Sequence, residues 1–392
     1  MFRGALQCLS LSRRATINPS RMASNKSNSE PEDPCCDPNN PRELTYQQIS
    51  IASHRIKIRK VVKTPCYRSR HLSKLTGCEV YLKMEVRQDT GSFKERGGLF
   101  ALTNLTEDEK KNGVYAASAG NHAQAVAIAG QRLGIKVNVV MPRHAPLMKI
   151  YKCKELGANV IVEGKDISVS KQLALKMAKE NQGKYINGYD MVDVLAGAGT
   201  VAEEIFNQVS DVDAILTPVG GGGLVAATCV AARALSPKTK VFGFVPETCP
   251  SMLKSLEAGK PVFTRCKPTL ADGLAVPLVG VNSFHTMKDI IYKVLPVKES
   301  DIAVGILRLL ETEKVVAEGA GAISASALLA GSLHELAGKK VNNNDDFSLL
   351  TEPNRNNRKF VDKIYFDNRF SSSSDAMRCV ILVERFITTR PT

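Results

Sequence analysis

The middle of the chain shows two blocks of alternating helix-like and strand-like segments. In the first block, residues 121–133 have small and apolar side chains at helical spacing, and a strand-like run at 137–140 follows. The alternation continues as a helix, a strand and a helix, predicted over residues 146–156, 159–162 and 168–179. Such alternation is typical of an α/β fold with a mainly parallel sheet.

The second block begins with a predicted strand over residues 214–217. A run of glycines at 220–223 follows it, and a helix is predicted over 224–235. Two such blocks predict two open parallel-sheet lobes with a cleft between them, where α/β proteins bind ligands. We expect one folded domain over residues 42–341, in which a smaller lobe, about 112–190, is inserted in a larger lobe.

The N-terminal residues lack this periodicity. Residues 1–29 contain arginines and serines but no acidic residue, which resembles a mitochondrial presequence. The alternative is a disordered start with Met22 as the initiator. Residues 30–41 are rich in proline, asparagine and acidic residues and predict a linker, so residues 1–41 are expected to be disordered. The expected location is the cytoplasm or the mitochondrion.

The C-terminal residues also lose the pattern. Residues 338–341 are typical of the approach to a buried strand, but a polar run at 342–346 follows them. Residues 342–392 have no sustained periodicity and include consecutive serines at 371–374. We therefore predict an atypical tail over 342–392 that lacks a last core strand.

Composition narrows the choice of partners. The chain of 392 residues has 43% hydrophobic and 23% charged residues and a formal net charge of +14. The basic residues are dispersed, and the densest run, between Arg55 and Lys74, contains one aromatic residue, Tyr67, and no nucleic-acid-binding motif, which predicts a solvated face. No apolar run is long enough to span a bilayer. We expect neither a nucleic acid nor a membrane as partner.

The cysteines show no paired spacing of the kind that binds metal ions. Those within the folded part are expected to be reduced thiols of an intracellular protein. They are Cys66, Cys78, Cys153, Cys229, Cys249 and Cys266.

The glycine run Gly220, Gly221, Gly222 and Gly223 lies between a predicted strand and a predicted helix. Consecutive glycines let backbone N–H groups converge on one anion, and the helix N-terminus adds a partial positive charge. The run lacks the lysine of a nucleotide P-loop and the spacing of a dinucleotide-binding motif. A small phosphorylated cofactor fits it best, whereas the structural alternative is a tight turn.

Two further segments carry candidate chemistry. In residues 91–97, Ser92 is a plausible helix N-cap that places Lys94 in the first turn, where the helix dipole disfavours a positive charge and favours a nucleophilic amine. Ser118, Asn121 and His122 lie at the start of the helix predicted over 121–133 and offer polar groups to a carboxylate. Alone, the first segment is a weak signal, because most lysines near helix starts are solvated, and the second is better explained as an ordinary helix cap.

Six short motifs occur in a fixed order along the chain. They are Gly-Ser-Phe-Lys-Glu-Arg-Gly at 91–97, Ser-Ala-Gly-Asn-His-Ala at 118–123, Ala-Gly-Ala-Gly-Thr at 196–200, Pro-Val-Gly-Gly-Gly-Gly-Leu at 218–224, Ala-Asp-Gly-Leu-Ala-Val at 271–276 and Glu-Gly-Ala-Gly-Ala at 318–322. Together they resemble fold-type II pyridoxal-phosphate enzymes, whose fold is that of the tryptophan synthase beta subunit. The last two motifs are similar to those of L-threonine/L-serine dehydratases and their serine racemase relatives. The resemblance covers about residues 42–341.

The resemblance implies a cofactor, a reaction and a role for each site residue. Pyridoxal 5'-phosphate would be bound by Phe93, Lys94, Asn121, Gly220, Gly221, Gly222, Gly223, Gly273 and Glu318. Lys94 would be the catalytic residue that holds the aldehyde and then removes the α-proton. Ser118, Asn121 and His122 would bind the carboxylate of L-threonine or L-serine, which would yield 2-oxobutanoate or pyruvate plus ammonia. The resemblance also implies a homodimer or homotetramer.

Three departures from the resemblance bear on activity. Ala119 stands where racemase relatives have a second catalytic serine, so elimination is favoured over racemisation. Val245 stands where some relatives have a metal-binding carboxylate, so no metal is predicted there. No Ser/Cys-Gly-Gly-Asn segment, which pairs with the pyridine nitrogen in the family, follows Val341. The alternatives are therefore a serine racemase and a catalytically impaired pseudoenzyme, and the lack of a readable regulatory domain favours a catabolic dehydratase.

Overall fold

The computed structural model describes residues 33–59, 61–333 and 377–384 as an α/β structure with two sheets. The larger, six-stranded sheet has the order β1-β2-β10-β7-β8-β9 and is parallel except for the pairing of β1 with β2. Its strands are β1 (Cys66–Arg68), β2 (Glu79–Lys83), β7 (Ala214–Pro218), β8 (Lys240–Pro246), β9 (Lys293–Val297) and β10 (Arg378–Leu382). The predicted strand at 214–217 is thus confirmed as β7.

The smaller sheet is parallel throughout and has the order β5-β4-β3-β6. Its strands are β3 (Val114–Ala117), β4 (Val137–Met141), β5 (Asn159–Val162) and β6 (Lys184–Tyr185). All four lie between β2 and β7 in the sequence. The alternation predicted over residues 121–179 is confirmed, because α5 (Asn121–Leu133), α6 (Leu147–Glu155) and α7 (Ile167–Glu180) connect these strands.

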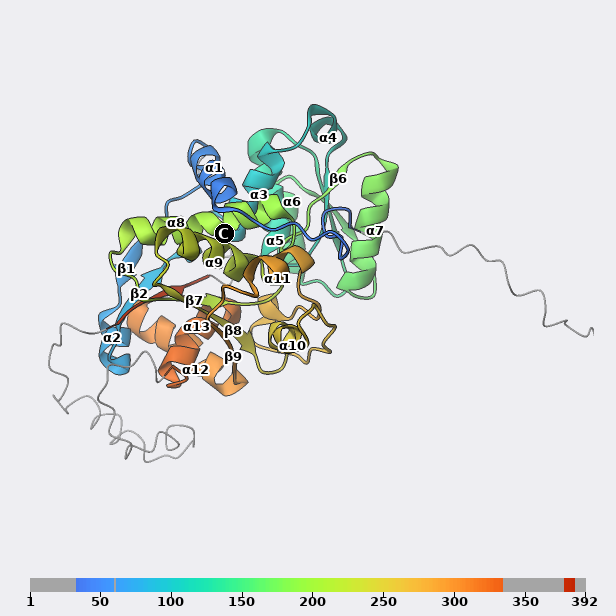
Figure 1. Cartoon of the computed structure of the whole chain (residues 1–392). Coiled ribbons are helices and arrows are strands. Elements are labelled where there is room, and N and C mark those ends of the chain that lie inside the picture. Colours follow the sequence, from blue (N-terminus) through green and yellow to red (C-terminus); the bar gives the residue numbers. More distant parts are fainter. Residues whose placement is uncertain (1–32, 60, 334–376, 385–392) are drawn as a thin grey trace, which may run out of the picture. The chain divides into compact units, whose positions relative to one another are not determined.

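Helices cover both sheets (Figure 1). The remaining helices are α1 (Tyr46–Lys57), α2 (Arg70–Thr76), α3 (Lys94–Thr103), α4 (Glu107–Asn112), α8 (Val192–Gln208), α9 (Gly223–Leu235), α10 (Ser251–Ala258), α11 (Val281–Met287), α12 (Glu299–Glu313) and α13 (Gly319–Leu329). The parallel strands are nearly continuous apolar runs, as expected of strands buried on both faces. None of the described helices is long and apolar enough to cross a membrane.

The prediction that the chain lacks a last core strand is wrong. β10, drawn in dark red in Figure 1, lies between β2 and β7, with Val380 paired to Tyr81 on one side and Ile215 on the other. Its cysteine, valine, isoleucine and leucine side chains are all fully buried. The strand has only 5 residues and follows a long stretch without periodicity, so its position in the sheet is fixed by tertiary pairing and not by a local pattern.

The predicted disorder of residues 1–41 is wrong for their described part. Asp33 accepts a hydrogen bond of 2.8 Å from Asn187, and Asn282 donates one of 2.7 Å to the carbonyl of Cys35. Polar side chains of the folded body thus hold residues 33–41 in place. Residues 1–32, which include the predicted presequence, lie outside the described residues.

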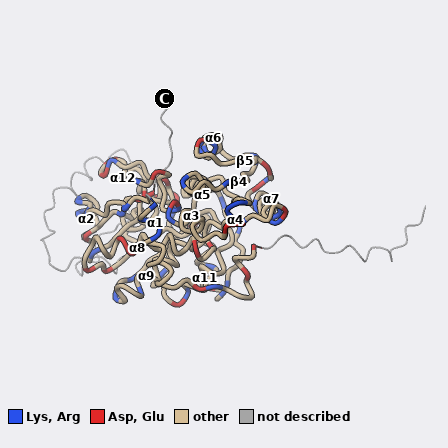
Figure 2. Tube along the Cα trace, turned by 90° about the horizontal axis from the view of Figure 1, so that it is seen from above, with Lys and Arg blue, Asp and Glu red and all other residues tan. Residues whose placement is uncertain are grey.

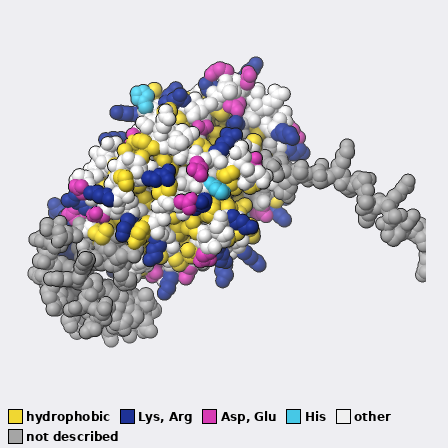
Figure 3. Space-filling view, viewed as in Figure 1, with side chains coloured by type: hydrophobic (Ala, Val, Ile, Leu, Met, Phe, Trp, Pro, Cys, Tyr) yellow, Lys and Arg dark blue, Asp and Glu magenta, His cyan; other side chains and the backbone are white. Residues whose placement is uncertain are grey.

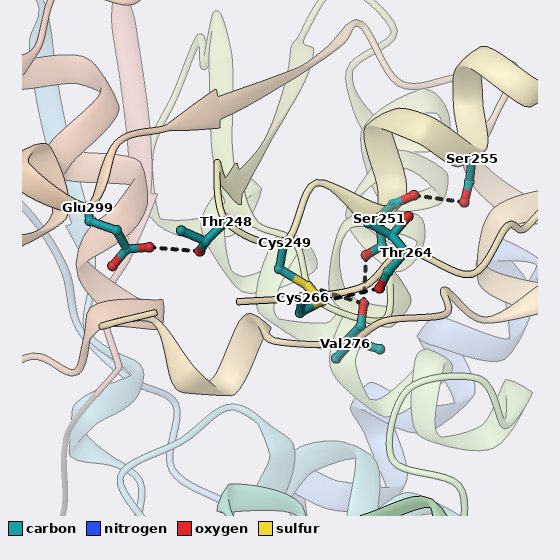
Figure 4. The surroundings of a disulfide bond; sticks show 8 residues. All are labelled: Thr248, Cys249, Ser251, Ser255, Thr264, Cys266, Val276 and Glu299. Carbon is teal, nitrogen blue, oxygen red and sulfur yellow. Dashed lines mark hydrogen bonds between the residues drawn. A yellow bond between two sulfur atoms is a disulfide. The ribbon is translucent and has the colours of Figure 1, made fainter. Parts of the chain in front are cut away.

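The prediction that Cys249 and Cys266 are free thiols is also wrong. They form a disulfide with a Cα–Cα distance of 4.4 Å across a sequence separation of 17 (Figure 4). The chain passes through α10 and a loop and then returns to the end of β8, and this return cannot be inferred from cysteine spacing. Of the other predicted thiols, Cys66, Cys153 and Cys229 are free, and the Cys78 thiol interacts with that of Cys379.

Charged side chains of both signs are interspersed over the described part of the chain (Figure 2), and the face shown in Figure 3 mixes them with apolar side chains. The basic residues between Arg55 and Lys74 are mostly exposed, which confirms the predicted solvated face.

Candidate active site

Lys94 is the first residue of α3, as the sequence predicts for a lysine in the first helical turn. The N-cap position falls on Phe93, one residue after the predicted cap, but Ser92 Oγ still accepts a hydrogen bond of 3.3 Å from the Lys94 N–H. The helix is held closely on one side, because a Cβ at Gly97 would lie 2.6 Å from the carbonyl oxygen of Val194 in α8. Glycine at position 97 thus lets α3 pack closely against α8, and this contact fixes the position of Lys94.

A buried ion pair also anchors the start of α3. The Arg96 guanidinium, 0% exposed, contacts Glu85 at 2.8 Å and Glu204 of α8 at 2.8 Å. A buried charge without a partner costs roughly several kcal/mol, and Arg96 keeps both partners only when α3 lies in this position. The two ion pairs therefore stabilise one placement of the helix. The anchor lies two residues beyond Lys94.

The glycine run forms the turn between β7 and α9. Gly222 has φ 102°, a left-handed conformation that favours glycine. A side chain on Gly221 would collide with the ring of Tyr189, and a Cβ at Gly220 would lie 3.2 Å from the Gly273 carbonyl oxygen. The loop therefore presents bare backbone at the N-terminus of a 13-residue helix, which is a favourable arrangement for a phosphate.

Lys94 and the glycine run line the same cavity. Its lining includes every residue predicted to bind the cofactor, namely Phe93, Lys94, Asn121, Gly220, Gly221, Gly222, Gly223, Gly273 and Glu318. Further lining residues, not predicted from the sequence, include Gly188, Tyr189, Val194, Leu195, Val276, Ala320 and Glu384.

Asn121 and Glu318 are joined directly in this cavity. Asn121 Nδ2, in the first turn of α5, donates a hydrogen bond of 2.9 Å to Glu318 Oε1, at the N-cap of α13. Burial raises the pKa of Glu318 to about 8, and repulsion by Glu384 and Asp272 acts in the same direction. Glu318 therefore carries a proton near neutral pH.

Two predicted substrate-binding side chains do not line the described cavity. Ser118 Oγ accepts a hydrogen bond of 3.1 Å from the Gly120 N–H and so shapes the turn before α5. His122 is 5% exposed, and its Nε2 lies 2.9 Å from the Ile186 carbonyl oxygen. Burial lowers the pKa of His122 to about 4, and the nearby charge of Lys94 contributes, so the ring is neutral near pH 7. This placement suits a positioning residue and not a proton donor.

Glu384 and Tyr189 are functional candidates that the sequence reasoning missed. Glu384 follows β10, is 3% exposed, and accepts hydrogen bonds from Ser92 Oγ at 2.7 Å and from the Phe93 N–H at 3.1 Å. Tyr189 packs against Gly221. The apolar run from Cys379 to Val383, which ends in an isolated acid, was the available signal for Glu384.

No group of three or more histidine, cysteine, aspartate or glutamate residues that could hold a metal ion occurs in the described ranges. Val245, the position considered for a metal ligand, is fully buried in β8. The prediction that no metal binds there remains a prediction.

A family model described as "pyridoxal-phosphate dependent enzyme" matches residues 59–341. The chain belongs to this family. It is 44% identical over 298 residues to an L-threonine ammonia-lyase of Thermotoga maritima, which covers 76% of this chain and 74% of the relative. An L-threonine ammonia-lyase of Geobacter sulfurreducens is 37% identical over 298 residues, again 76% of this chain and 74% of the relative.

Solved structures agree with the fold. Serine racemase of Dictyostelium discoideum matches with a TM-score of 0.72 at 30% identity, covering 88% of this chain and 99% of that chain. Threonine deaminase isoform 2 of Solanum lycopersicum matches with a TM-score of 0.70 at 32% identity, covering 75% and 88%. The predicted fold-type II architecture and the predicted cofactor, pyridoxal phosphate, are confirmed.

The cavity fits this cofactor. An amine for its aldehyde and a glycine turn at a helix N-terminus for its phosphate line the same space. A side chain at Gly220 would meet Gly273 and Leu274, and one at Gly221 would meet Tyr189, so the turn accommodates glycine at both positions.

Proposed function

We propose that this protein is an ammonia-lyase that converts L-threonine to 2-oxobutanoate, or L-serine to pyruvate, with release of ammonia. The observation that supports this most strongly is the meeting of Lys94 with the glycine run in one cavity. The two threonine ammonia-lyases, at 44% and 37% identity, support the choice of reaction.

Lys94 has two roles in the proposed reaction. Its Nζ would hold the cofactor aldehyde in the resting enzyme, and the free amine would accept the substrate α-proton. When bound, the cofactor would supply the electron sink that makes this proton removable. Lys94 would return the proton to the leaving β-hydroxyl, which departs as water, and a second water molecule would hydrolyse the resulting enamine to the keto acid and ammonia, so no oxidant is needed.

Asn121 and the turn before α5 position the substrate and the cofactor. The Asn121 amide would contact the ring hydroxyl, and backbone N–H groups at the start of this 13-residue helix would receive the substrate carboxylate. Ser118 and His122 would support this turn from outside the cavity, through the Ser118 contact with Gly120 and the His122 contact with Ile186.

Serine racemase activity is a second candidate, because the racemase of Dictyostelium discoideum shares the fold at 30% identity. Racemisation needs a base on each face of the substrate, and Ala119 supplies none. We therefore place elimination first.

The proposed assembly and location follow the sequence-based expectations. We propose a homodimer or homotetramer, to be tested by analytical ultracentrifugation. We propose residence in the cytoplasm or the mitochondrion, to be tested by imaging of the full chain and of a variant that starts at Met22.

Keto-acid formation from L-threonine and L-serine tests the proposed function. Wild-type protein should produce keto acid and ammonia in equal amounts. Lys94→Ala should lower the rate by at least about a thousandfold, because it removes the proposed base and the covalent attachment point. Lys110→Ala, on exposed α4, is the matched control and should retain the wild-type rate. Absence of keto acid from wild-type protein that retains the cofactor would overturn the proposal.

A further inference from the structure

Glu384 is held at the edge of the larger sheet that also carries the glycine run. β10 and β7 are parallel neighbours, so their carboxyl ends lie at the same edge, and Glu384 follows β10 as Gly220–Gly223 follow β7. The Glu384 carbonyl oxygen accepts a hydrogen bond of 3.0 Å from the Glu318 N–H. A Cβ at Gly321 would lie 2.6 Å from the same oxygen, so α13 is seated directly on this residue.

The Glu384 side chain is bound to the residues just before Lys94. Its Oε1 accepts the hydrogen bonds from Ser92 Oγ and the Phe93 N–H, at 2.7 and 3.1 Å. Within the part of the chain that the structure describes, no hydrogen bond reaches its Oε2. A nearly buried carboxylate in a ligand cavity, with one oxygen engaged by the protein, leaves the other oxygen to meet a donor on the ligand.

We propose that Glu384 is the acid that pairs with the pyridine nitrogen of the cofactor. This inference rests on the proposed site, in which Lys94 holds the aldehyde and Gly220–Gly223 hold the phosphate. The nitrogen lies across the ring from the carbon that bears the aldehyde, whereas the ring hydroxyl lies next to that carbon. Asn121 is assigned to the hydroxyl and is bonded to Glu318, so this pair belongs to the hydroxyl side. Glu384 is the remaining carboxylate of the described lining.

The charges of the cavity agree with this assignment. Burial raises the pKa of both carboxyl groups, but the Ser92 and Phe93 donors act against this for Glu384, whereas the charge of Glu384 raises the pKa of Glu318 further. The donors from Ser92 and Phe93 thus stabilise the ionised form of Glu384. A buried carboxylate is costly without a cationic partner, and a protonated pyridine nitrogen is such a partner. The relatives are expected to offer a neutral hydroxyl or thiol instead, so the acid is a departure of this chain.

A cofactor analogue in which a C–H group replaces the ring nitrogen, 1-deazapyridoxal phosphate, isolates this contact. The full-length apoprotein is titrated with pyridoxal phosphate and with the analogue, and the two dissociation constants are compared. Wild-type protein should bind pyridoxal phosphate about tenfold to a hundredfold more tightly, as expected for a charge-assisted hydrogen bond. In Glu384→Gln, which keeps an oxygen for Ser92 and Phe93, the ratio should fall to about threefold or less.

Glu318→Gln is the matched control, because it makes the same substitution at the other acidic residue of the cavity and should keep the wild-type ratio. A wild-type protein that binds both compounds equally would overturn the proposal, whether or not the variants fold. Equal ratios in the wild type and in Glu384→Gln, or in Glu384→Asp if the glutamine variant does not fold, would also overturn it. Mass analysis after borohydride treatment separates this failure from that of the proposed function, because attachment to Lys94 is independent of the ratio.

Discussion

Asn121 donates a 2.9 Å hydrogen bond to Glu318, and this bond joins α5, which connects two strands of the smaller sheet, to α13, which packs on the larger sheet. Both residues line the cavity that contains Lys94. The bond thus couples the placement of the predicted cofactor contacts on α5 to a carboxyl group that is protonated near neutral pH. The ionisation of Glu318 should then be visible in stability as well as in activity.

The stability of the apoprotein should depend on pH through Glu318. Its pKa is about 8 in the folded protein, against an ordinary value of 4.5 for a glutamate. Between these values the folded state binds more protons than the unfolded state, so the free energy of unfolding falls as pH rises. The stabilising contribution of the protonated group is lost as pH rises through about 8. Glu318→Gln should melt close to the wild type at pH 5 and above it at pH 8, by about 2–4 °C for each kcal/mol recovered. A constant difference across pH 5–8 would contradict this.

Gly222 should be more sensitive to substitution than a glycine of similar backbone conformation outside the site. Gly222→Ala places a methyl group at φ 102° and 2.6 Å from Met252 Cε. Gly259→Ala has φ 69° and meets nothing within 4 Å. Both should lose about 1–2 kcal/mol of stability from the left-handed conformation. Only Gly222→Ala should also lower cofactor affinity, about tenfold or more. Equal cofactor affinities in the two variants would show that the glycine turn does not hold the phosphate.

Reduction of the disulfide should destabilise the loop that carries Gly273 and Val276 to the cavity. Ser251 Oγ donates a hydrogen bond of 2.6 Å to the Val276 carbonyl oxygen beside Cys249 (Figure 4). A cross-link that closes a loop of this length contributes about 3 kcal/mol to stability. Urea unfolding with and without reductant measures the loss, and Cys249→Ala/Cys266→Ala should not respond to reductant. Peptide mapping that finds both thiols free in the isolated protein would contradict the pairing.

Elimination should dominate over racemisation because of Ala119. Chiral analysis of serine recovered from the reaction should show much less D-serine than pyruvate, since one face of the substrate lacks a base. Ala119→Ser should raise the D-serine fraction. D-serine formation by the wild type at a rate comparable with pyruvate formation would show that another residue supplies the second base.

The site residues predicted correctly from the sequence all lie in short segments whose own sequence indicates a turn, a helix start or a family motif. Gly220–Gly223 lie at the start of a helix that the periodicity indicates, and Lys94 lies at a helix start that Ser92 indicates as a plausible N-cap. The motif resemblance supplied Gly273 and Glu318. Each of these residues lines the cavity.

The residues that were missed or misjudged depend on contacts between distant segments. β10 is recognisable only by its pairing with β2 and β7, because a short buried strand has no polar alternation and this one follows a long irregular stretch. Glu384 was missed with it. Cys249 and Cys266 meet because a loop returns to β8. Ser118 and His122 are adjacent to Asn121 in sequence, but turn and helix geometry direct them away from the cavity.

The covalent attachment of the cofactor is the central claim, and it can be measured directly. Purified full-length protein is treated with borohydride, digested and analysed by mass spectrometry. The account predicts a pyridoxyl phosphate label on Lys94, with loss of the absorption of the bound cofactor. A label on another lysine, or no label on a folded sample supplied with pyridoxal phosphate, would contradict it.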